Sequence, residues 1–390
     1  MRWFFFTAVV SLMACSSEKA PRGEVEAVEA VEEKVESDWL VFRGNAHLSG
    51  VSPETLAAPL ELAWSKQLGG ERRVAVLASA VIADGKVFVG ATNGVFYCLA
   101  LEDGKVLWEF DSGSDIEGTA ALAGDLVCFG NLDGEVIALR AETGELIWRT
   151  SLSGEVFGGV NVAVRAEEST LFLVGCYDAY LRALDAMTGE VVWELETGDR
   201  VNGTPTILGS EVLFGGCDGF IYYADVSSGS ITRKVEFDAP IANSVGAAHG
   251  LAAFGYYGNE VVGLEAETGE IRWRFGERNF PFFSCPAITE ESVFVGGRDR
   301  RMYRLDAVTG EKVWEFSAGG QVDSSALLAG ELVIFGTAAG KLFALDQATG
   351  QSQWSYEVGG DVTASPALSR GTLVIGTEDG TLFGFREKGD

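Results

Sequence analysis

Only two histidines occur in this chain of 390 residues, His47 and His249. Histidine-based catalytic triads and zinc sites need such a side chain close to a nucleophile or to cysteines. Neither histidine has a spacing that indicates this chemistry, and a structural role is the more ordinary interpretation of each. The sequence therefore predicts no catalytic residue, no metal ligand and no cofactor, and it favours a protein that is not an enzyme.

Cysteines are also few, and none occurs in a Cys-Cys or Cys-x-x-Cys pair. Beyond Cys15 the chain has five, an odd number that leaves at least one unpaired: Cys98, Cys128, Cys176, Cys217 and Cys285. Each stands beside a strand-like run, which favours a role as a small buried apolar side chain. If one disulfide forms, Cys176 and Cys217 are the best placed, because they follow equivalent segments of neighbouring repeats.

Basic residues are outnumbered, with 29 Lys and Arg against 57 Asp and Glu and a formal net charge of −28. A surface this acidic repels phosphate backbones, so nucleic acid is not expected among the partners. Helical spacing of apolar residues is also missing from the body of the chain. Glycine, by contrast, is abundant, with 50 residues, and it recurs in a regular pattern.

The first residues are typical of a targeting segment. Arg2 precedes an apolar run that is shorter than the roughly 20 residues of a membrane-spanning helix. The tetrad Leu12-Met13-Ala14-Cys15 resembles the lipobox of bacterial lipoproteins. That resemblance implies a signal peptide over residues 1–14 and acylation of Cys15, palmitate included. An ordinary signal peptide with a chance cysteine is the alternative.

Residues 15–37 are rich in Glu, Val and Ala and show no apolar face. This composition predicts an acidic flexible tether between the lipid and the folded body. Ser16 and Ser17 follow the cysteine where an acidic residue could stand, and this resembles the pattern for sorting to the outer membrane. The expected location is therefore the cell envelope, with the membrane contacted through the lipid anchor only.

A phrase of the form Thr-Gly-x-x-x-Trp recurs along the body of the chain. Its tryptophans are Trp148, Trp193, Trp273, Trp314 and Trp354; the copy that ends at Trp108 has Asp103 in place of Thr, and one degenerate copy has Arg233 instead of the tryptophan. The spacing is close to 40 residues, which is typical of propellers and other repeat architectures. We therefore expect residues 61–390 to form one closed unit rather than two or three domains.

A second phrase, an apolar run that ends in glycine, defines each blade. It occurs eight times, ending at Gly90, Gly130, Gly175, Gly215, Gly255, Gly296, Gly336 and Gly376. A turn such as Asn-Gly or Asp-Gly follows most of these runs and indicates a hairpin. Two further strands come after the turn and one short strand precedes the run, so each repeat predicts four strands. The middle strands are apolar at successive positions, as expected when both faces are covered.

The two ends of the body complete one blade. The last repeat stops near Phe385 with three strands, whereas the stretch around Trp64 is an unpaired copy of the Trp strand. Placing that stretch outermost in the last blade closes the ring and removes an exposed edge. The sequence thus predicts an all-β fold, an eight-bladed β-propeller of four-stranded antiparallel blades. An open solenoid is the alternative, but it would need polar caps that are not visible.

The tryptophans themselves have two interpretations. The structural one places each ring between blades, next to a Thr-Gly turn. The functional one has several of the rings stacking on a ligand. The regular position of the tryptophan in every blade favours the structural interpretation.

The run Leu-Asp-Ala-x-Thr-Gly-x-x-x-Trp, present at 184–193 and 305–314, resembles the PQQ-type, tryptophan-docking propeller repeat. The leader segment, residues 38–60, begins with Trp39-Leu40-Val41-Phe42-Arg43-Gly44 after Asp38 and is similar to a segment of many secreted bacterial proteins with this repeat. Length, lipobox and eight blades together resemble the BamB lipoproteins. That resemblance implies a scaffold for protein partners in outer-membrane assembly, a monomer within a complex that faces the periplasm.

The same repeat occurs in quinoprotein dehydrogenases, and their resemblance implies different chemistry. Those enzymes stack a quinone against a tryptophan and a vicinal disulfide, and they bind Ca²⁺ close to a catalytic Asp. This chain has no Cys-Cys pair and lacks the long insertions of those enzymes. A quinone- or small-ligand-binding propeller with a redox role remains the second interpretation. An extracytoplasmic sensor or carbohydrate-binding module is the third.

The mouth of the central funnel is where we expect binding. Two positions before the Ser or Thr of each inner strand stand Leu77, Glu117, Phe157, Asn202, Ala242, Phe282, Asp323 and Thr363. The loop from Arg278 to Phe283 breaks the repeat and carries adjacent aromatics, which is typical of contact sites, although local packing of a longer loop also explains it. The candidate binding residues are Glu117, Phe157, Asn202, Arg278, Phe280, Phe282, Phe283 and Asp323.

Overall fold

The computed structural model describes residues 38–70, 74–165 and 169–389. The segment Ser37–Asp390 forms a compact unit. The expected signal peptide (1–14), the lipidation site Cys15 and the tether (15–37) lie outside the described residues. Among the residues that are described, no helix is long and apolar enough to cross a bilayer.

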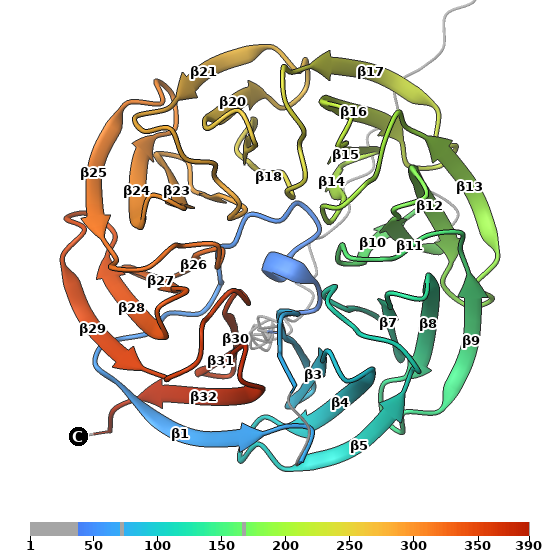
Figure 1. The fold of residues 1–390 in the computed structure, drawn as a ribbon, viewed down its shortest axis with the longest axis horizontal. Coiled ribbons are helices and arrows are strands. Elements are labelled where there is room, and N and C mark those ends of the chain that lie inside the picture. The colour runs from blue at the N-terminus through green and yellow to red at the C-terminus, as the bar shows by residue number, and fades with distance from the viewer. Residues whose placement is uncertain (1–37, 71–73, 166–168, 390) are drawn as a thin grey trace, which may run out of the picture. The chain divides into compact units, whose positions relative to one another are not determined.

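Eight four-stranded antiparallel sheets surround a central axis (Figure 1). Within seven of them the four strands are consecutive in the chain, and each sheet is one blade. The predicted all-β, eight-bladed propeller is confirmed. The inner strands are short, as predicted; the one in the last blade extends from Ala367 to Ser369.

The blades follow chain order from the first inner strand. Blade 1 comprises β2 (Val81–Ala83), β3 (Lys86–Gly90), β4 (Val95–Ala100) and β5 (Val106–Asp111), and blade 2 comprises β6 (Ala121–Ala123), β7 (Leu126–Gly130), β8 (Glu135–Arg140) and β9 (Leu146–Ser151). Blade 3 comprises β10 (Asn161–Val164), β11 (Thr170–Gly175), β12 (Tyr180–Asp185) and β13 (Val191–Glu196). Blade 4 comprises β14 (Thr206–Leu208), β15 (Glu211–Gly215), β16 (Phe220–Asp225) and β17 (Ile231–Glu236).

The second half of the ring repeats this plan. Blade 5 comprises β18 (Gly246–Ala248), β19 (Leu251–Gly255), β20 (Val261–Glu265) and β21 (Ile271–Phe275), and blade 6 comprises β22 (Ala287–Ile288), β23 (Ser292–Gly297), β24 (Arg301–Asp306) and β25 (Lys312–Ser317). Blade 7 comprises β26 (Leu327–Ala329), β27 (Leu332–Gly336), β28 (Lys341–Asp346) and β29 (Ser352–Glu357). Blade 8 comprises β30 (Ala367–Ser369), β31 (Thr372–Gly376), β32 (Thr381–Glu387) and β1 (Leu60–Gln67).

Strand β1 closes the ring. It pairs antiparallel with β32, so the N-terminal strand is the outermost member of the last blade. Trp64 lies opposite Gly384 in this pairing. The predicted closure is confirmed, and it joins the beginning and the end of the propeller through backbone hydrogen bonds.

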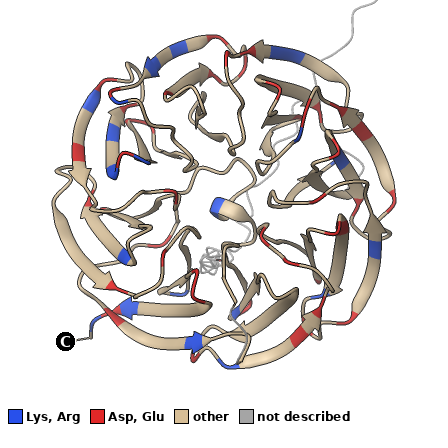
Figure 2. Cartoon of the chain, in the orientation of Figure 1, with Lys and Arg blue, Asp and Glu red and all other residues tan. Residues whose placement is uncertain are grey.

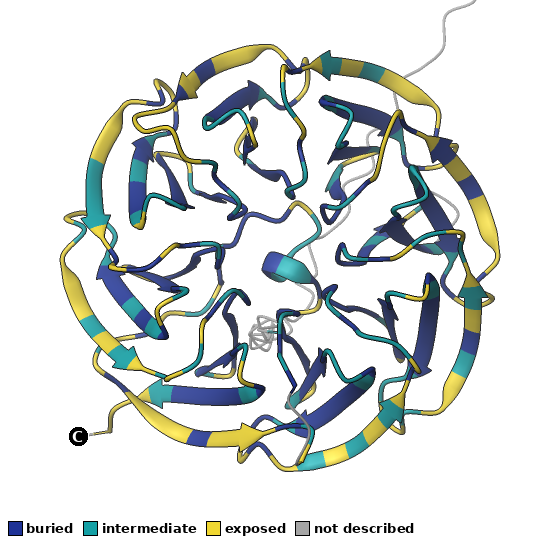
Figure 3. Cartoon of the chain, viewed as in Figure 1, coloured by how far each residue is buried: buried dark blue, intermediate teal, exposed yellow. Residues whose placement is uncertain are grey.

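Burial follows the position of a strand in its blade. The second and third strands, such as β7 and β8, are buried almost throughout, whereas outer strands such as β17 alternate exposed and half-buried residues (Figure 3). Charged side chains concentrate on the outer strands and loops (Figure 2). Blades pack on both faces of each middle strand, which explains why these strands are apolar at successive positions.

The tryptophans join neighbouring blades. The indole N–H of Trp148 in blade 2 donates to the carbonyl of Ala186 in blade 3 at 2.9 Å. Its ring lies on Gly189, so closely that a Cβ atom at this glycine would come within 2.5 Å of the ring. The same bond recurs for Trp64, Trp108, Trp193, Trp273 and Trp314. The structural interpretation of these six tryptophans is therefore confirmed, and each of them docks on the turn glycine of the following blade.

The Arg233 copy of the phrase uses another packing. The guanidinium of Arg233 stacks over the ring of Tyr223 at 3.9 Å and pairs with Glu211 at 2.6 Å. Gly269, the turn glycine of the next blade, faces Val235 and Tyr223 where the other turns face an indole. The loss of the tryptophan at this junction is thus compensated by a cation–π stack and an ion pair.

The leader segment runs once around the base of the channel and contacts every blade. Trp39 exchanges two backbone hydrogen bonds with Ile82 of blade 1, both 2.8 Å. Later residues of the leader form hydrogen bonds with blades 2 to 8 in turn, and these residues are Leu40, Ala46, His47, Ser49, Gly50, Ser52 and Glu54. The 3-10 helix η1 (Phe42–Gly44) lies at the centre of the ring in Figure 1.

Both histidines have backbone roles in this arrangement. The carbonyl of His47 accepts from the N–H of Ala247 at 2.9 Å, and His249 occupies the turn after β18 with a φ of 51°. The structural interpretation agrees with these positions.

Candidate functional site

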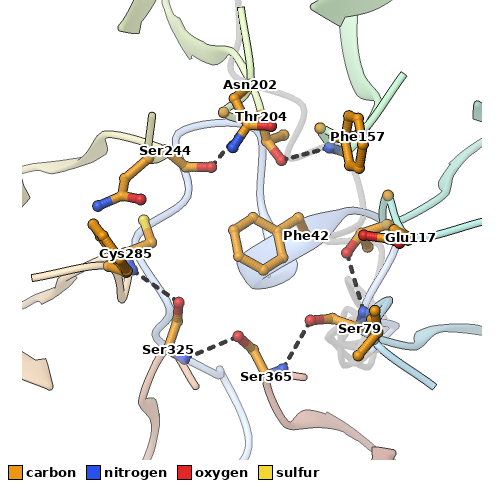
Figure 4. Close-up of a pocket in the computed structure, with 18 of the residues that line it drawn as sticks. Phe42, Ser79, Glu117, Phe157, Asn202, Thr204, Ser244, Cys285, Ser325 and Ser365 are labelled. Carbon is orange, nitrogen blue, oxygen red and sulfur yellow. Dashed lines mark hydrogen bonds between the residues drawn. The ribbon is translucent and has the colours of Figure 1, made fainter. Parts of the chain in front are cut away.

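A belt of hydroxyl groups surrounds the channel at the start of the inner strands (Figure 4). The backbone N–H of Ser365 donates to the hydroxyl of Ser79, and that of Ser79 donates to Thr119, at 2.9 and 3.2 Å. The equivalent positions of the eight blades are Ser79, Thr119, Gly159, Thr204, Ser244, Cys285, Ser325 and Ser365. Six such bonds link neighbouring blades in the described chain.

The belt is interrupted where the hydroxyl is missing. Gly159 and Cys285 stand at two of the eight positions, and among the described residues the bonds from the N–H groups of Thr119 and Ser244 are absent. Burial raises the pKa of the Cys285 thiol to about 11, against the opposing effect of the Arg43 guanidinium. A neutral thiol is a weak acceptor, so it is a poor substitute for a serine hydroxyl at this position.

Cys285→Ser is therefore expected to stabilise the protein. The introduced hydroxyl accepts the N–H of Ser244, and one such bond contributes about 0.5–1.5 kcal/mol to the free energy of unfolding. Cys128→Ser is the matched control: Cys128 is fully buried in the apolar core, where a hydroxyl without a partner costs about 1–3 kcal/mol. Urea denaturation of both variants measures the difference. Equal losses in both would contradict the role of the belt.

A shallow bowl of about 200 Å³ opens above the belt. Its wall is formed by one residue from each blade: Leu77, Glu117, Phe157, Asn202, Ala242, Phe283, Asp323 and Thr363. Phe42 from the leader lies at its centre (Figure 4). The leader therefore supplies the floor, and the bowl opens away from the face where the leader runs.

The bowl brings together five of the eight candidate residues: Glu117, Phe157, Asn202, Phe283 and Asp323. Arg278 lies outside it and pairs with Asp299 at 3.3 Å, and Phe280 is 48% exposed on the same loop. Phe282 does not lie in the wall, where the register had placed it. This residue is buried and packs against Phe275 and Tyr303, and Phe283 takes the place in the wall.

The error has a local cause. The prediction counted back from Ser284, but Cys285 holds the belt position in blade 6, while the Ser284 hydroxyl donates to the carbonyl of Gly296. The sequence reasoning also missed Phe42 as part of the site. The Trp-x-x-Phe-Arg-Gly pattern in the leader was the available signal, because an aromatic residue ahead of a closed ring has few other places to be buried.

One side of the bowl is aromatic. Phe157 packs against Tyr177 with ring centroids 4.4 Å apart, and Phe283 packs against Tyr257 at 4.8 Å. Arginines lie over these pairs: Arg200 over Tyr177 at 5.1 Å and Arg298 over Phe283 at 4.2 Å. These side chains come from blades 3 to 6 and the loops between them.

The other side is acidic. Glu117 is half-buried beside Asp115, and burial together with the charge of Asp115 raises the pKa of Glu117. Asp323, before blade 7 on the same half of the ring, accepts hydrogen bonds from Arg298 at 2.8 to 3.1 Å. Among the described residues, Glu117 and Asp115 have no comparable ion pair.

The cysteines from Cys98 onward are all unpaired. Cys98, Cys128, Cys176 and Cys285 are buried and Cys217 is partly exposed. Burial raises the pKa of Cys98 to about 12 and that of Cys176 to about 11. The suggested disulfide between Cys176 and Cys217 is not formed, and the buried thiols act as small apolar side chains.

Comparison with known proteins places this ring in a family. The family model described as outer membrane protein assembly factor BamB matches residues 61–236 and 217–389. The chain belongs to the BamB family. The BamB of Shewanella oneidensis is 24% identical over 299 residues, covering 70% of this chain and 73% of the relative. The crystal structure of BamB from Moraxella catarrhalis superposes with a TM-score of 0.70 at 18% identity, covering 84% of this chain and all of that one.

A shorter stretch is similar to an enzyme. The 1-butanol dehydrogenase (quinone) of Thauera butanivorans is 32% identical over 110 residues, which cover 26% of this chain. This match spans only 18% of the length of the dehydrogenase. The shared stretch is therefore a few propeller repeats and not a whole enzyme.

The residues of the bowl do not fit a quinone that is held with a metal ion. No group of three or more His, Cys, Asp or Glu side chains stands together in the described part of the chain. The volume of about 200 Å³ is below the roughly 300–1,000 Å³ of typical small-molecule sites. The one cysteine that lines the pocket, Cys285 of the belt, has no cysteine neighbour in the sequence.

Proposed function

We propose that this chain is a protein-binding scaffold of the cell envelope that acts in outer-membrane protein assembly. The observation that carries the proposal is the match to the BamB family model across both halves of the ring. A closed propeller whose repeats are devoted to packing offers loops and a central bowl as contact surfaces. The propeller would act as a monomer within a larger complex, with protein partners and without nucleic acid.

We also propose that Cys15 carries the lipid anchor after removal of residues 1–14, and that residues 15–37 are the tether. In this proposed division of the chain, residues 38–60 are a leader segment and residues 61–390 are the propeller. The first described residue, Asp38, accepts from the N–H of Asp84, in the turn that follows β2. This contact attaches the beginning of the leader to blade 1.

Cys15→Ala is expected to release the protein from membranes. Metabolic labelling with a palmitate analogue and fractionation of envelopes measure this, with Ser16→Ala as the matched control. Undiminished labelling in the Cys15 variant would refute the anchor but leave the scaffold proposal intact.

Cross-linking in cells tests the scaffold itself. A photo-activatable phenylalanine analogue at Tyr257, half exposed beside the bowl, is expected to capture a protein of the β-barrel assembly machinery. The same analogue at Val191, on an outer strand and 43% exposed, is the control. If mass spectrometry of the Tyr257 adducts finds no assembly protein, the proposed role in outer-membrane assembly fails.

A quinone-binding propeller is the second candidate, favoured by the stretch similar to a quinone-dependent dehydrogenase. Absorbance spectra and metal analysis of the purified chain separate the two. A stoichiometric quinone or calcium ion would replace the scaffold proposal.

A further inference from the structure

The wall of the bowl has an aromatic side and an acidic side, and not every negative charge of the acidic side has an ion-pair partner. This wall contains two carboxylates, Glu117 and Asp323, and no lysine or arginine. Asp323 is neutralised by Arg298, whose guanidinium donates to both carboxylate oxygens. Glu117 instead lies beside a second acid, Asp115, and neither has an ion pair within the described residues. The acidic side is thus left with negative charge that a bound group can neutralise.

Aromatic surface adjoins this charge. Phe157 belongs to the blade after that of Glu117, and the two side chains are neighbours around the ring (Figure 4). A cation that pairs with Glu117 is therefore next to Phe157, and cation–π attraction adds to the ion pair where the cation lies over the face of the ring. Farther round the wall, the small residues Asn202 and Ala242 separate Phe157 from Phe283.

This part of the wall has an aromatic residue at each end. These residues are Phe157 and Phe283, each braced by a tyrosine at 4.4 and 4.8 Å. Braced aromatic side chains lose little conformational entropy on binding, which makes them effective contact residues. Together with Phe42 at the centre of the bowl, they offer aromatic surface to a large apolar or aromatic side chain.

We propose that the bowl binds a polypeptide segment of a partner in which a lysine or arginine stands next to an aromatic residue. The basic side chain pairs with Glu117 and Asp115, and the aromatic side chain lies between Phe157 and Phe283. The net charge of −28 favours a basic partner by long-range attraction. The inference rests on the proposed protein-binding role and adds the chemistry of the bound segment.

Calorimetric titration with synthetic peptides tests this inference on the full-length chain in detergent. The probe is a twelve-residue Gly/Ser peptide with a central Lys-Phe pair, and the comparison peptide has Glu-Phe at the same place. We expect binding of the Lys-Phe peptide only. Glu117→Gln and Phe157→Ala are each expected to weaken it about tenfold, as for one part-buried ion pair or one aromatic contact. Glu267→Gln, on an exposed turn outside the bowl wall, is the control and should bind normally.

The pH dependence gives a second readout. Protonation of Glu117 removes the charge that attracts the basic side chain, so affinity falls as the pH is lowered. Because the pKa of Glu117 is raised, this fall begins at a higher pH than for an ordinary glutamate. The Glu117→Gln variant should lose this part of the pH dependence.

Three results would overturn the inference: equal binding of both peptides, binding unaffected by Glu117→Gln, or no binding of either peptide. If cross-linking from Tyr257 still captures an assembly protein in those cases, the scaffold proposal stands and only the assigned segment is wrong. If instead no assembly protein is captured while the Lys-Phe peptide binds as expected, the bowl inference stands and the assembly role fails.

Discussion

Replacement of Trp148 by alanine is expected to lower the free energy of unfolding by about 3–5 kcal/mol, the usual cost of removing a large buried aromatic side chain. Trp148 is 8% exposed, and its indole N–H donates across the blade junction to Ala186. The ring also covers Gly189 of the next blade. The substitution therefore removes apolar contact and a hydrogen bond at once, and it leaves a carbonyl of the neighbouring blade unpaired.

Trp354→Ala is the matched control, because the repeat gives this tryptophan no turn to dock on. Blade 8 ends with β1 instead of a Thr-Gly strand, and Trp354 packs on Tyr356 and Phe385 at 6.0 and 5.4 Å. A half-buried side chain without the cross-blade bond should cost about 1–2 kcal/mol. Urea denaturation followed by fluorescence measures both. Similar losses for the two would mean that docking is not the source of the stability.

The docking arrangement shows what the repeat could and could not predict. The number of blades was predictable from the eight equivalent runs that end in glycine, because every blade packs on its neighbours in the same way. The closure of the ring was predictable from Trp64, which belongs to an unpaired copy of the Trp strand. The direction of docking was not predictable, since the sequence alone does not tell whether Gly189 serves Trp148 or Trp193. The packing of Arg233 was not predictable either, and its contacts with Tyr223 and Glu211 are those of a substitute for the tryptophan.

The candidate site was predictable to the extent that it follows the repeat. Glu117, Phe157, Asn202 and Asp323 were found by register and line the bowl. Register failed in blade 6, where the step from Trp273 to Cys285 is one residue longer than from Trp314 to Ser325 and Ser284 looked like the belt residue. The Trp-x-x-Phe-Arg-Gly pattern offered a signal for Phe42, but the path of the leader was not predictable, because it is set by hydrogen bonds to eight separate blades.

Trp39→Ala is expected to have the second large effect, again about 3–5 kcal/mol, because this residue holds the beginning of the leader. Trp39 is 2% exposed and exchanges two backbone hydrogen bonds with Ile82. A Cβ atom on Gly44 would lie 2.6 Å from its ring, so the indole packs against the last residue of η1. Without it, η1 loses this packing and the leader can detach from blade 1.

Limited proteolysis reports on that detachment directly. Arg43 is 2% exposed, so trypsin can cleave after it only when the leader opens, and the rate follows the population of the open state. We expect cleavage at Arg43 to be at least about tenfold faster in Trp39→Ala. Leu40→Ala, one residue on and 37% exposed, should cost less than about 1 kcal/mol and leave the rate nearly unchanged. If both variants are cleaved at the wild-type rate, the leader is held by its many backbone bonds to the other blades, and Trp39 contributes to stability without controlling access to the floor of the bowl.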